Sequence, residues 1–197
     1  MESEILKMSA NVSMDLNAQE NKKDLHYNAN DDFSPPPFIG CLISDKDGIR
    51  IASFEVYKGA LEFNIKRNIN DKSRCELFDV DLISMYFCAL ERFSEEINIQ
   101  NVPCINLKGT NIILHAIFDF DHFTVIFFLN PFVHIKSYEN LIHNYFTKLY
   151  EEYKSEFHDI KKLGSLDFAN HLEFLGMEWI NHLNDLYLEK SIKIKKK

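Results

Sequence analysis

The chain has 197 residues, of which 46% are hydrophobic and 26% are charged, and its formal net charge is −8. This apolar fraction is ordinary for a folded domain, so the composition excludes wholesale disorder. The acidity argues against a general nucleic-acid-binding protein, because neutralising phosphates requires clustered lysine and arginine. With 17 Phe and 8 Tyr, the chain has ample aromatic material for one large core.

The first 37 residues differ from the rest in composition. They hold three lysines and seven acidic residues and end in Ser34-Pro35-Pro36-Pro37. Such a segment cannot bury enough apolar surface to offset its chain entropy, so it predicts a disordered acidic tail before a domain over residues 38–190. The sequence shows neither a signal-peptide pattern nor the roughly 20 apolar residues of a transmembrane helix, so we expect a cytoplasmic protein.

Five strands are expected in the domain. Phe38–Ser44 and Ile49–Tyr57 flank a turn that ends in glycine and form one predicted hairpin. Ile105–Lys108 and Ile112–Phe118 form a second predicted hairpin. Phe123–Leu129 is apolar nearly throughout, which predicts a central strand that is covered on both faces.

Three helices complete the predicted elements: Asp79–Ile97 with Asp79 as N-cap, Tyr138–Phe157, and Leu166–Lys190. The residues of the first helix that we expect to face the sheet repeat at three- and four-residue spacing: Leu82, Ile83, Tyr86, Leu90, Phe93 and Ile97. The polar segment Gly59–Phe78 predicts a loop or irregular edge, with a short strand near Ala60–Ile65 as the alternative.

These elements predict an α+β fold: a five-stranded antiparallel sheet in ββαβββαα order, with helices on both faces. The sheet must be antiparallel because the hairpin links are too short for parallel crossovers. The pattern resembles the longin and roadblock superfamily. The resemblance is carried by FIGCLISDKDGIRIASFEV, LISMYFCALERF, INLKGTNIILHAIFDFDHFTVIFFL and the following helix YENLIHNYFTKLYEEY.

The resemblance implies a non-enzymatic interaction module that binds a small GTPase or a sister longin or roadblock subunit, in vesicle trafficking or GTPase regulation. The chain departs from the SNARE type, since no long heptad region or membrane anchor follows the domain. This departure favours a stand-alone regulator or complex subunit. The alternative is a small-ligand sensor domain of PAS, GAF or profilin-like fold, which predicts a pocket between sheet and helices.

Four residues are candidates for a partner interface. Met85 and Phe87 lie outside the expected core stripe of their helix and predict either a partner surface or a wide core face. Ile105 and Leu107 lie on an expected edge strand. In roadblock-like proteins such an edge can pair with a second copy, so we expect homo- or heterodimerisation through this region.

No catalytic, cofactor or metal site is predicted. The histidines and acids around the second hairpin match no metal-ligand spacing and are better explained as turn residues: His115, His122, His134, His143, Asp119 and Asp121. The four cysteines form no C-x-x-C pair and predict buried or neutral thiols. No phosphate-binding loop and no nucleophile elbow is present in the sequence.

Residues 191–197 form an expected basic tail, whose lysines are Lys193, Lys195, Lys196 and Lys197. Lysines close to lipid contribute about 1 kcal/mol each to binding an anionic membrane. Weak peripheral membrane contact is therefore one hypothesis. The simpler one is a solubilising helix end, where positive charge complements the helix dipole.

Overall fold

The computed structural model describes residues 35–66, 79–99, 101–157 and 166–195. The fold described here is that of the unit Ser34–Lys197. The predictions for residues 1–34, for the end of the Gly59–Phe78 segment, and for Lys196 and Lys197 lie outside the described residues. None of the described helices is long and apolar enough to span a membrane.

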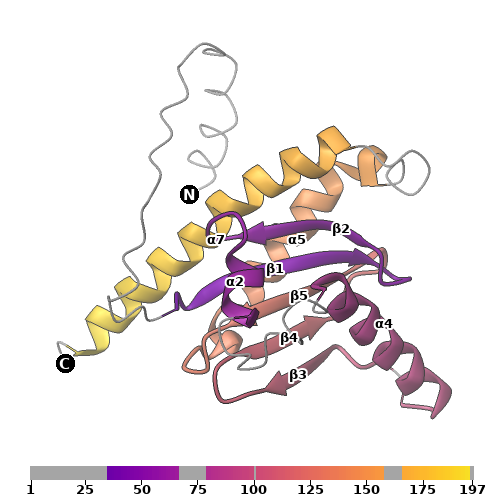
Figure 1. Cartoon of the computed structure of the whole chain (residues 1–197), viewed down its shortest axis with the longest axis horizontal. Coiled ribbons are helices and arrows are strands. Elements are labelled where there is room, and N and C mark those ends of the chain that lie inside the picture. Colours follow the sequence, from indigo (N-terminus) through magenta and orange to yellow (C-terminus); the bar gives the residue numbers. More distant parts are fainter. Residues whose placement is uncertain (1–34, 67–78, 100, 158–165, 196–197) are drawn as a thin grey trace. The chain divides into compact units, whose positions relative to one another are not determined.

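The sheet has five antiparallel strands: β1 (Phe38–Asp45), β2 (Arg50–Glu55), β3 (Cys104–Lys108), β4 (Ile113–Ile117) and β5 (Phe123–Leu129). Their order in space is β2-β1-β5-β4-β3, so β5 is central and β2 and β3 are the edges (Figure 1). All seven residues of β5 are buried, as its apolar run predicts. The predicted α+β fold with a five-stranded antiparallel sheet is confirmed, and the predicted order of elements lacks one helix, which lies between β2 and the next predicted helix.

One face of the sheet is covered by α5 (Glu139–Glu152), which follows the 3₁₀ turn η1 (Ile135–Ser137), and by α7 (Leu166–Lys195). Aromatic rings fill the space between. Phe146 of α5 stacks on Phe54 of β2 with centroids 5.9 Å apart, and Trp179 of α7 stacks on Tyr145 at 4.1 Å. Stacked and edge-on ring pairs at such distances add to the free energy gained from burial alone.

Helix α7 lies close against the edge strand β2. A Cβ atom added at Gly176 would come within 1.9 Å of the Phe54 ring, so only glycine permits this approach. Farther along the helix, Asn184 holds the first residue of β1. Its Oδ1 accepts from the backbone N–H of Phe38 at 2.8 Å, and its Nδ2 donates to the Phe38 carbonyl at 2.9 Å.

The opposite face carries α2 (Ala60–Lys66) and α4 (Asp81–Glu96). The prediction of a loop or short strand over Ala60–Ile65 is wrong. Ala60, Leu61 and Asn64 repeat at helical spacing and are buried, and Asn64 donates to the Ala60 carbonyl at 2.8 Å. At the start of α4, Asp79 Oδ1 accepts from the backbone N–H of Asp81 at 2.9 Å, although the N-cap position is Val80.

Candidate interaction surface

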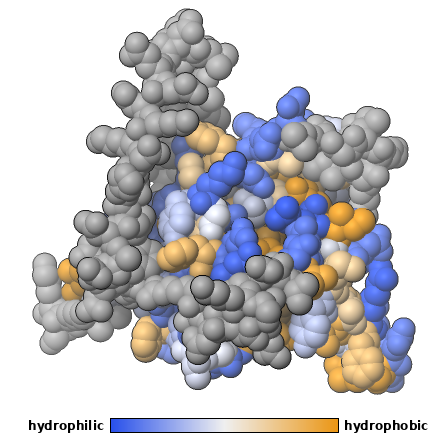
Figure 2. Space-filling model, in the orientation of Figure 1, coloured by the Kyte–Doolittle hydropathy of each residue, from blue (hydrophilic) through white to orange (hydrophobic). Residues whose placement is uncertain are grey.

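Helix α4 carries large apolar side chains on its exposed side. Five large side chains on α4 and its C-cap, and one more just beyond, are each 50–55% exposed: Leu82, Met85, Tyr86, Phe93, Ile97 and Ile99. From Leu82 to Ile97 they recur at spacings of three, four and seven residues, which place them on one stripe along the helix. Figure 2 shows hydrophobic side chains gathered at the lower right, where Figure 1 places the C-terminal end of α4. We call the six residues the α4 stripe.

The prediction that Leu82, Tyr86, Phe93 and Ile97 face the sheet is therefore wrong. Ile83 and Leu90 of the same predicted face are half-buried and pack against the core beneath α4. The residues that α4 buries are Ser84, Phe87, Cys88 and Ser94, three of which are small and carry a hydroxyl or thiol group. Phe87 is fully buried, so its assignment to a partner surface is also wrong: it belongs to the core beneath α4. Met85 lies in the exposed stripe, in the region where an interface was predicted.

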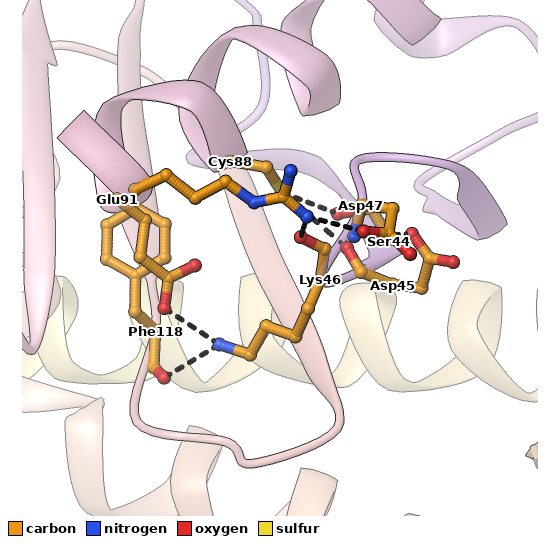
Figure 3. Close-up of polar contacts among 8 residues, drawn as sticks. Ser44, Asp45, Lys46, Asp47, Cys88, Glu91 and Phe118 are labelled. Carbon is orange, nitrogen blue, oxygen red and sulfur yellow. Dashed lines mark hydrogen bonds and ion pairs between the residues drawn. The ribbon is translucent and has the colours of Figure 1, made fainter. Parts of the chain in front are cut away.

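Polar contacts with the β1–β2 turn hold α4 in this orientation (Figure 3). Lys46 Nζ donates to Glu91 Oε1 at 2.9 Å and to the carbonyl of Phe118 at 3.1 Å. Arg92 pairs with Asp47, one residue farther along the same turn. Because two adjacent charged residues of the turn each meet a partner on α4, rotation of the helix about its axis would break both pairs.

Close backbone approach fixes the same helix at its other end. Gly48 has a φ of +86°, and a Cβ atom there would lie 2.8 Å from Met85 Cα. Ser84 Oγ lies 2.8 Å from the Gly48 carbonyl and donates to it. The glycine therefore serves both the left-handed turn and the contact with α4. The small residue Ser84 on the inner side of α4 allows this approach.

The edge strand β3 adds a second feature to this side of the molecule. Its residues Asn106, Leu107 and Lys108 are exposed, and Leu107 is 37% exposed. Ile105 is half-buried and packs against the core beneath α4. The outer edge of β3 is not paired with any described strand, because the sheet order ends there. An unpaired edge presents backbone N–H and C=O groups to an incoming strand.

Behind the edge, a buried histidine contacts the outer strand. His115 on β4 is 2% exposed, and its Nδ1 lies 2.6 Å from Asn106 Oδ1 on β3. Since an amide oxygen only accepts, His115 Nδ1 carries the proton in this contact. Burial lowers the pKa of His115 to about 4, so the ring is neutral at physiological pH.

The other candidates from the sequence do not converge on a chemical site. Among the described residues, no group of three or more His, Cys, Asp or Glu side chains is placed to hold a metal. Cys41 and Cys88 are buried free thiols, and burial raises the pKa of both. A shallow depression on α2 is lined by Glu62, Lys66 and two neighbours, and its acid and base pair with each other. Lys193 is exposed on α7.

Comparison with known proteins gives matches at the level of structure. No family model and no curated protein matches the chain. The gliding protein MglB from Thermus thermophilus is 8% identical with a TM-score of 0.37, and the match covers 52% of this chain and 67% of the MglB chain. Myxococcus xanthus MglB is 14% identical with a TM-score of 0.41, covering 60% and 85%. A roadblock/LC7 domain from Streptomyces avermitilis is 9% identical with a TM-score of 0.34, covering 55% and 88%.

The described part of the chain has the five-stranded antiparallel sheet and the helices on both faces that the resemblance implies. Its fold is an α+β domain with helices on both faces of one antiparallel sheet.

Proposed function

We propose that this chain is a non-enzymatic interaction module of the longin and roadblock kind, which pairs with a second such domain and binds a small GTPase. The observation that carries the proposal is the α4 stripe: six large apolar side chains held outward by a polar network on the inner side of their helix. A contiguous exposed apolar patch on a folded domain marks an interaction site.

The free energy of burial and the cost of association together favour an interface that uses both the α4 stripe and the free edge of β3. Burying a large apolar side chain fully contributes about 1.5–3 kcal/mol, so half-exposed ones contribute roughly half of that each. Association costs roughly 4–15 kcal/mol in lost freedom and ordering. The α4 stripe alone offsets only part of this range. Backbone hydrogen bonds along the unpaired edge of β3, which follows α4 in the chain, supply a further contribution and orient the partner.

The sensor alternative finds no support in the described core. It requires a ligand-sized space between the sheet and its helices. Rings of Phe54, Phe127, Phe146 and Trp179 fill that layer with centroid separations of 5.3–6.3 Å. The depression on α2 lies outside this layer and is shallow.

The test is to measure self-association and GTPase binding of the full chain and of one stripe variant. Analytical ultracentrifugation of the wild type should show a concentration-dependent dimer, and Tyr86→Ser/Phe93→Ser should weaken it at least tenfold. Phe174→Ser is the matched control, because Phe174 is equally exposed, at 52%, on the other side of the sheet.

The GTPase part of the proposal has its own readout. Immobilised chain should retain one member of a panel of purified small GTPases in a nucleotide-dependent manner, and the stripe variant should lose it. If the wild type is monomeric at high concentration and retains no GTPase in either nucleotide state, the proposed function is wrong.

A further inference from the structure

The free edge of β3 has a definite set of outward backbone groups. Gly109 N–H donates to the Ile112 carbonyl, and Phe118 N–H donates to the Pro103 carbonyl, both at 2.9 Å. Hydrogen-bonded positions alternate along an antiparallel strand. The odd-numbered residues of β3 therefore direct their backbone groups toward β4. Cys104, Asn106 and Lys108 direct theirs toward the free edge.

Side chains on β3 alternate between the two faces of the sheet. Asn106 lies beside His115, on the sheet face that α5 and α7 cover. Ile105 packs with the core on the α4 face, and Leu107 shares its side of the strand. A partner strand added to this edge would continue both faces.

A second copy of β3, related by a two-fold axis and antiparallel to the first, can be added in few registers. With Asn106 opposite its own copy, all three outward residues of each strand are paired, because Cys104 then lies opposite Lys108 of the second copy. Shifting the axis by one residue in either direction leaves one outward residue of each strand without a partner inside β3. Centring the axis on Lys108 places two ammonium groups opposite each other, which is destabilising.

Charge favours the same register. Burial raises the pKa of the Cys104 thiol, and the charges of Glu139 and Asp119 raise it further, while Lys136 lowers it. Two carboxylates and one ammonium group therefore lie near Cys104. In the register centred on Asn106, Lys108 of the second copy enters this neighbourhood of net negative charge.

The contact with His115 prepares Asn106 for the centre of such an interface. His115 Nδ1–H donates to Asn106 Oδ1 at 2.6 Å, which fixes the amide and leaves its Nδ2 donors free of that contact. An amide has one acceptor atom with two lone pairs, so Oδ1 can accept from a second amide as well. Two Asn106 side chains facing each other can thus bond reciprocally, as a polar residue at one core position fixes register in other assemblies.

We propose that β3 pairs with β3 of a second copy in a single antiparallel register with Asn106 on the two-fold axis, and that Asn106, held by His115, determines that register. The inference rests on the proposed pairing through this edge and adds the occupant and the alignment. On the α4 face, Ile105 of each copy then lies opposite Leu107 of the other.

Cysteine crosslinking of the full chain tests the register. Cys75 and Cys104 are replaced by serine, and Ile105→Cys and Leu107→Cys are made separately in that background. Directly opposite residues of a non-hydrogen-bonded pair have Cα atoms about 4.5 Å apart, within the range of a disulfide. Under mild oxidation a mixture of the two variants should form a crosslinked dimer at least tenfold faster than either variant alone.

The outcomes separate the register from the proposed function. Fast crosslinking of Ile105→Cys alone, or of Leu107→Cys alone, would show edge pairing in another register and would overturn the inference only. A dimer in ultracentrifugation with no crosslink in any sample would place the interface elsewhere and would also overturn it. A monomer in all samples would remove the pairing itself, and the inference with it.

A charge substitution tests Asn106 directly. Asn106→Asp keeps the acceptor for His115 and places two carboxylates opposite each other on the axis, so the dimer dissociation constant should rise at least tenfold. Asn111→Asp adds the same charge at an exposed position of the β3–β4 turn and should leave the dissociation constant within twofold. Equal effects of the two variants would contradict the role of Asn106.

Discussion

The two faces of the sheet are covered by helices in opposite ways. Helices α5 and α7 turn aromatic rings toward the sheet, where Phe146 and Trp179 meet rings from β2 and β5. Helix α4 buries one ring, Phe87, together with small residues against the sheet and the β1–β2 turn, and leaves a stripe of large apolar residues outside. The first arrangement stabilises the fold. The second leaves large apolar side chains of α4 half-exposed.

The largest effect on stability is expected at Phe146, for which Phe93 of the α4 stripe is the exposed counterpart. Phe146 is fully buried on α5, and replacing a core phenylalanine with alanine costs about 3–5 kcal/mol. Phe146→Ala should lower the free energy of unfolding by that amount in chemical denaturation. A loss below about 1 kcal/mol would contradict the central role of the aromatic layer.

The buried histidine makes stability on the β3–β4 side depend on pH. The pKa of His115 is about 4 in the folded protein and about 6.5 in the unfolded chain. Between these values the unfolded state binds the extra proton, so this residue destabilises the fold by about 3 kcal/mol as pH falls from 6.5 to 4, with no further loss below 4. The free energy of unfolding should be measured by chemical denaturation at several pH values in this range. For the wild type it should fall more steeply toward low pH than for His115→Gln. The same pH dependence in both proteins would refute the assignment.

Close packing of α7 is expected to be sensitive to a single methyl group. Gly176→Ala places its Cβ inside the Phe54 ring, so the helix or the ring must move, at a cost of about 1–3 kcal/mol. Gly59→Ala is not a suitable control because Gly59 has a φ of +82°. Ala169→Gly, a change in the opposite direction on the same helix, should cost no more than about 1 kcal/mol.

The polar contacts between the β1–β2 turn and α4 should contribute less to stability than the aromatic layer. Lys46→Met removes the contacts with Glu91 and the Phe118 carbonyl from a partly exposed site, where solvent screens the ion pair. The expected loss is about 1 kcal/mol. In Lys46→Met, faster hydrogen exchange of backbone amides confined to α4 would show that the Lys46 contacts orient this helix. A uniform change across the domain would argue against that role.

The smallest effect on stability is expected in the α4 stripe. Phe93→Ala changes a half-exposed side chain and should alter the free energy of unfolding of the monomer by about 0.5 kcal/mol or less. Measured at a concentration too low for association, it gives the matched counterpart of Phe146→Ala. Similar losses at the two positions would remove the distinction between the two faces.

The sequence predicts the strands better than the orientation of the helices. Alternating and continuous apolar runs place β1, β2 and β5 correctly, and the short links determine that they are antiparallel. The periodicity of α4 correctly reveals an apolar stripe from Leu82 to Ile97, but it says nothing about what covers that stripe. The inner side is decided by contacts distant in sequence, such as Ser84 with Gly48 and Lys46 with Glu91. The helix at Ala60–Lys66 is too short for periodicity to define.

The interface candidates show the same limit. Met85 and Leu107 are exposed and Phe87 is buried, although all three are apolar residues near the same helix and edge. The contact between His115 and Asn106 joins opposite positions on two strands, and only the register of β3 and β4 reveals it.

The two hydrogen bonds between the Asn184 side chain and the Phe38 backbone have a consequence for biosynthesis. They join residues 146 positions apart, so the start of β1 cannot be secured until most of α7 has been made. Until then, the nascent chain exposes the aromatic side of β1 and β2, including Phe54. Contacts of such long sequence separation slow folding and prolong the exposure of aggregation-prone intermediates. The domain therefore completes its fold after translation of α7, and chaperone binding should be greatest on chains stalled before that helix.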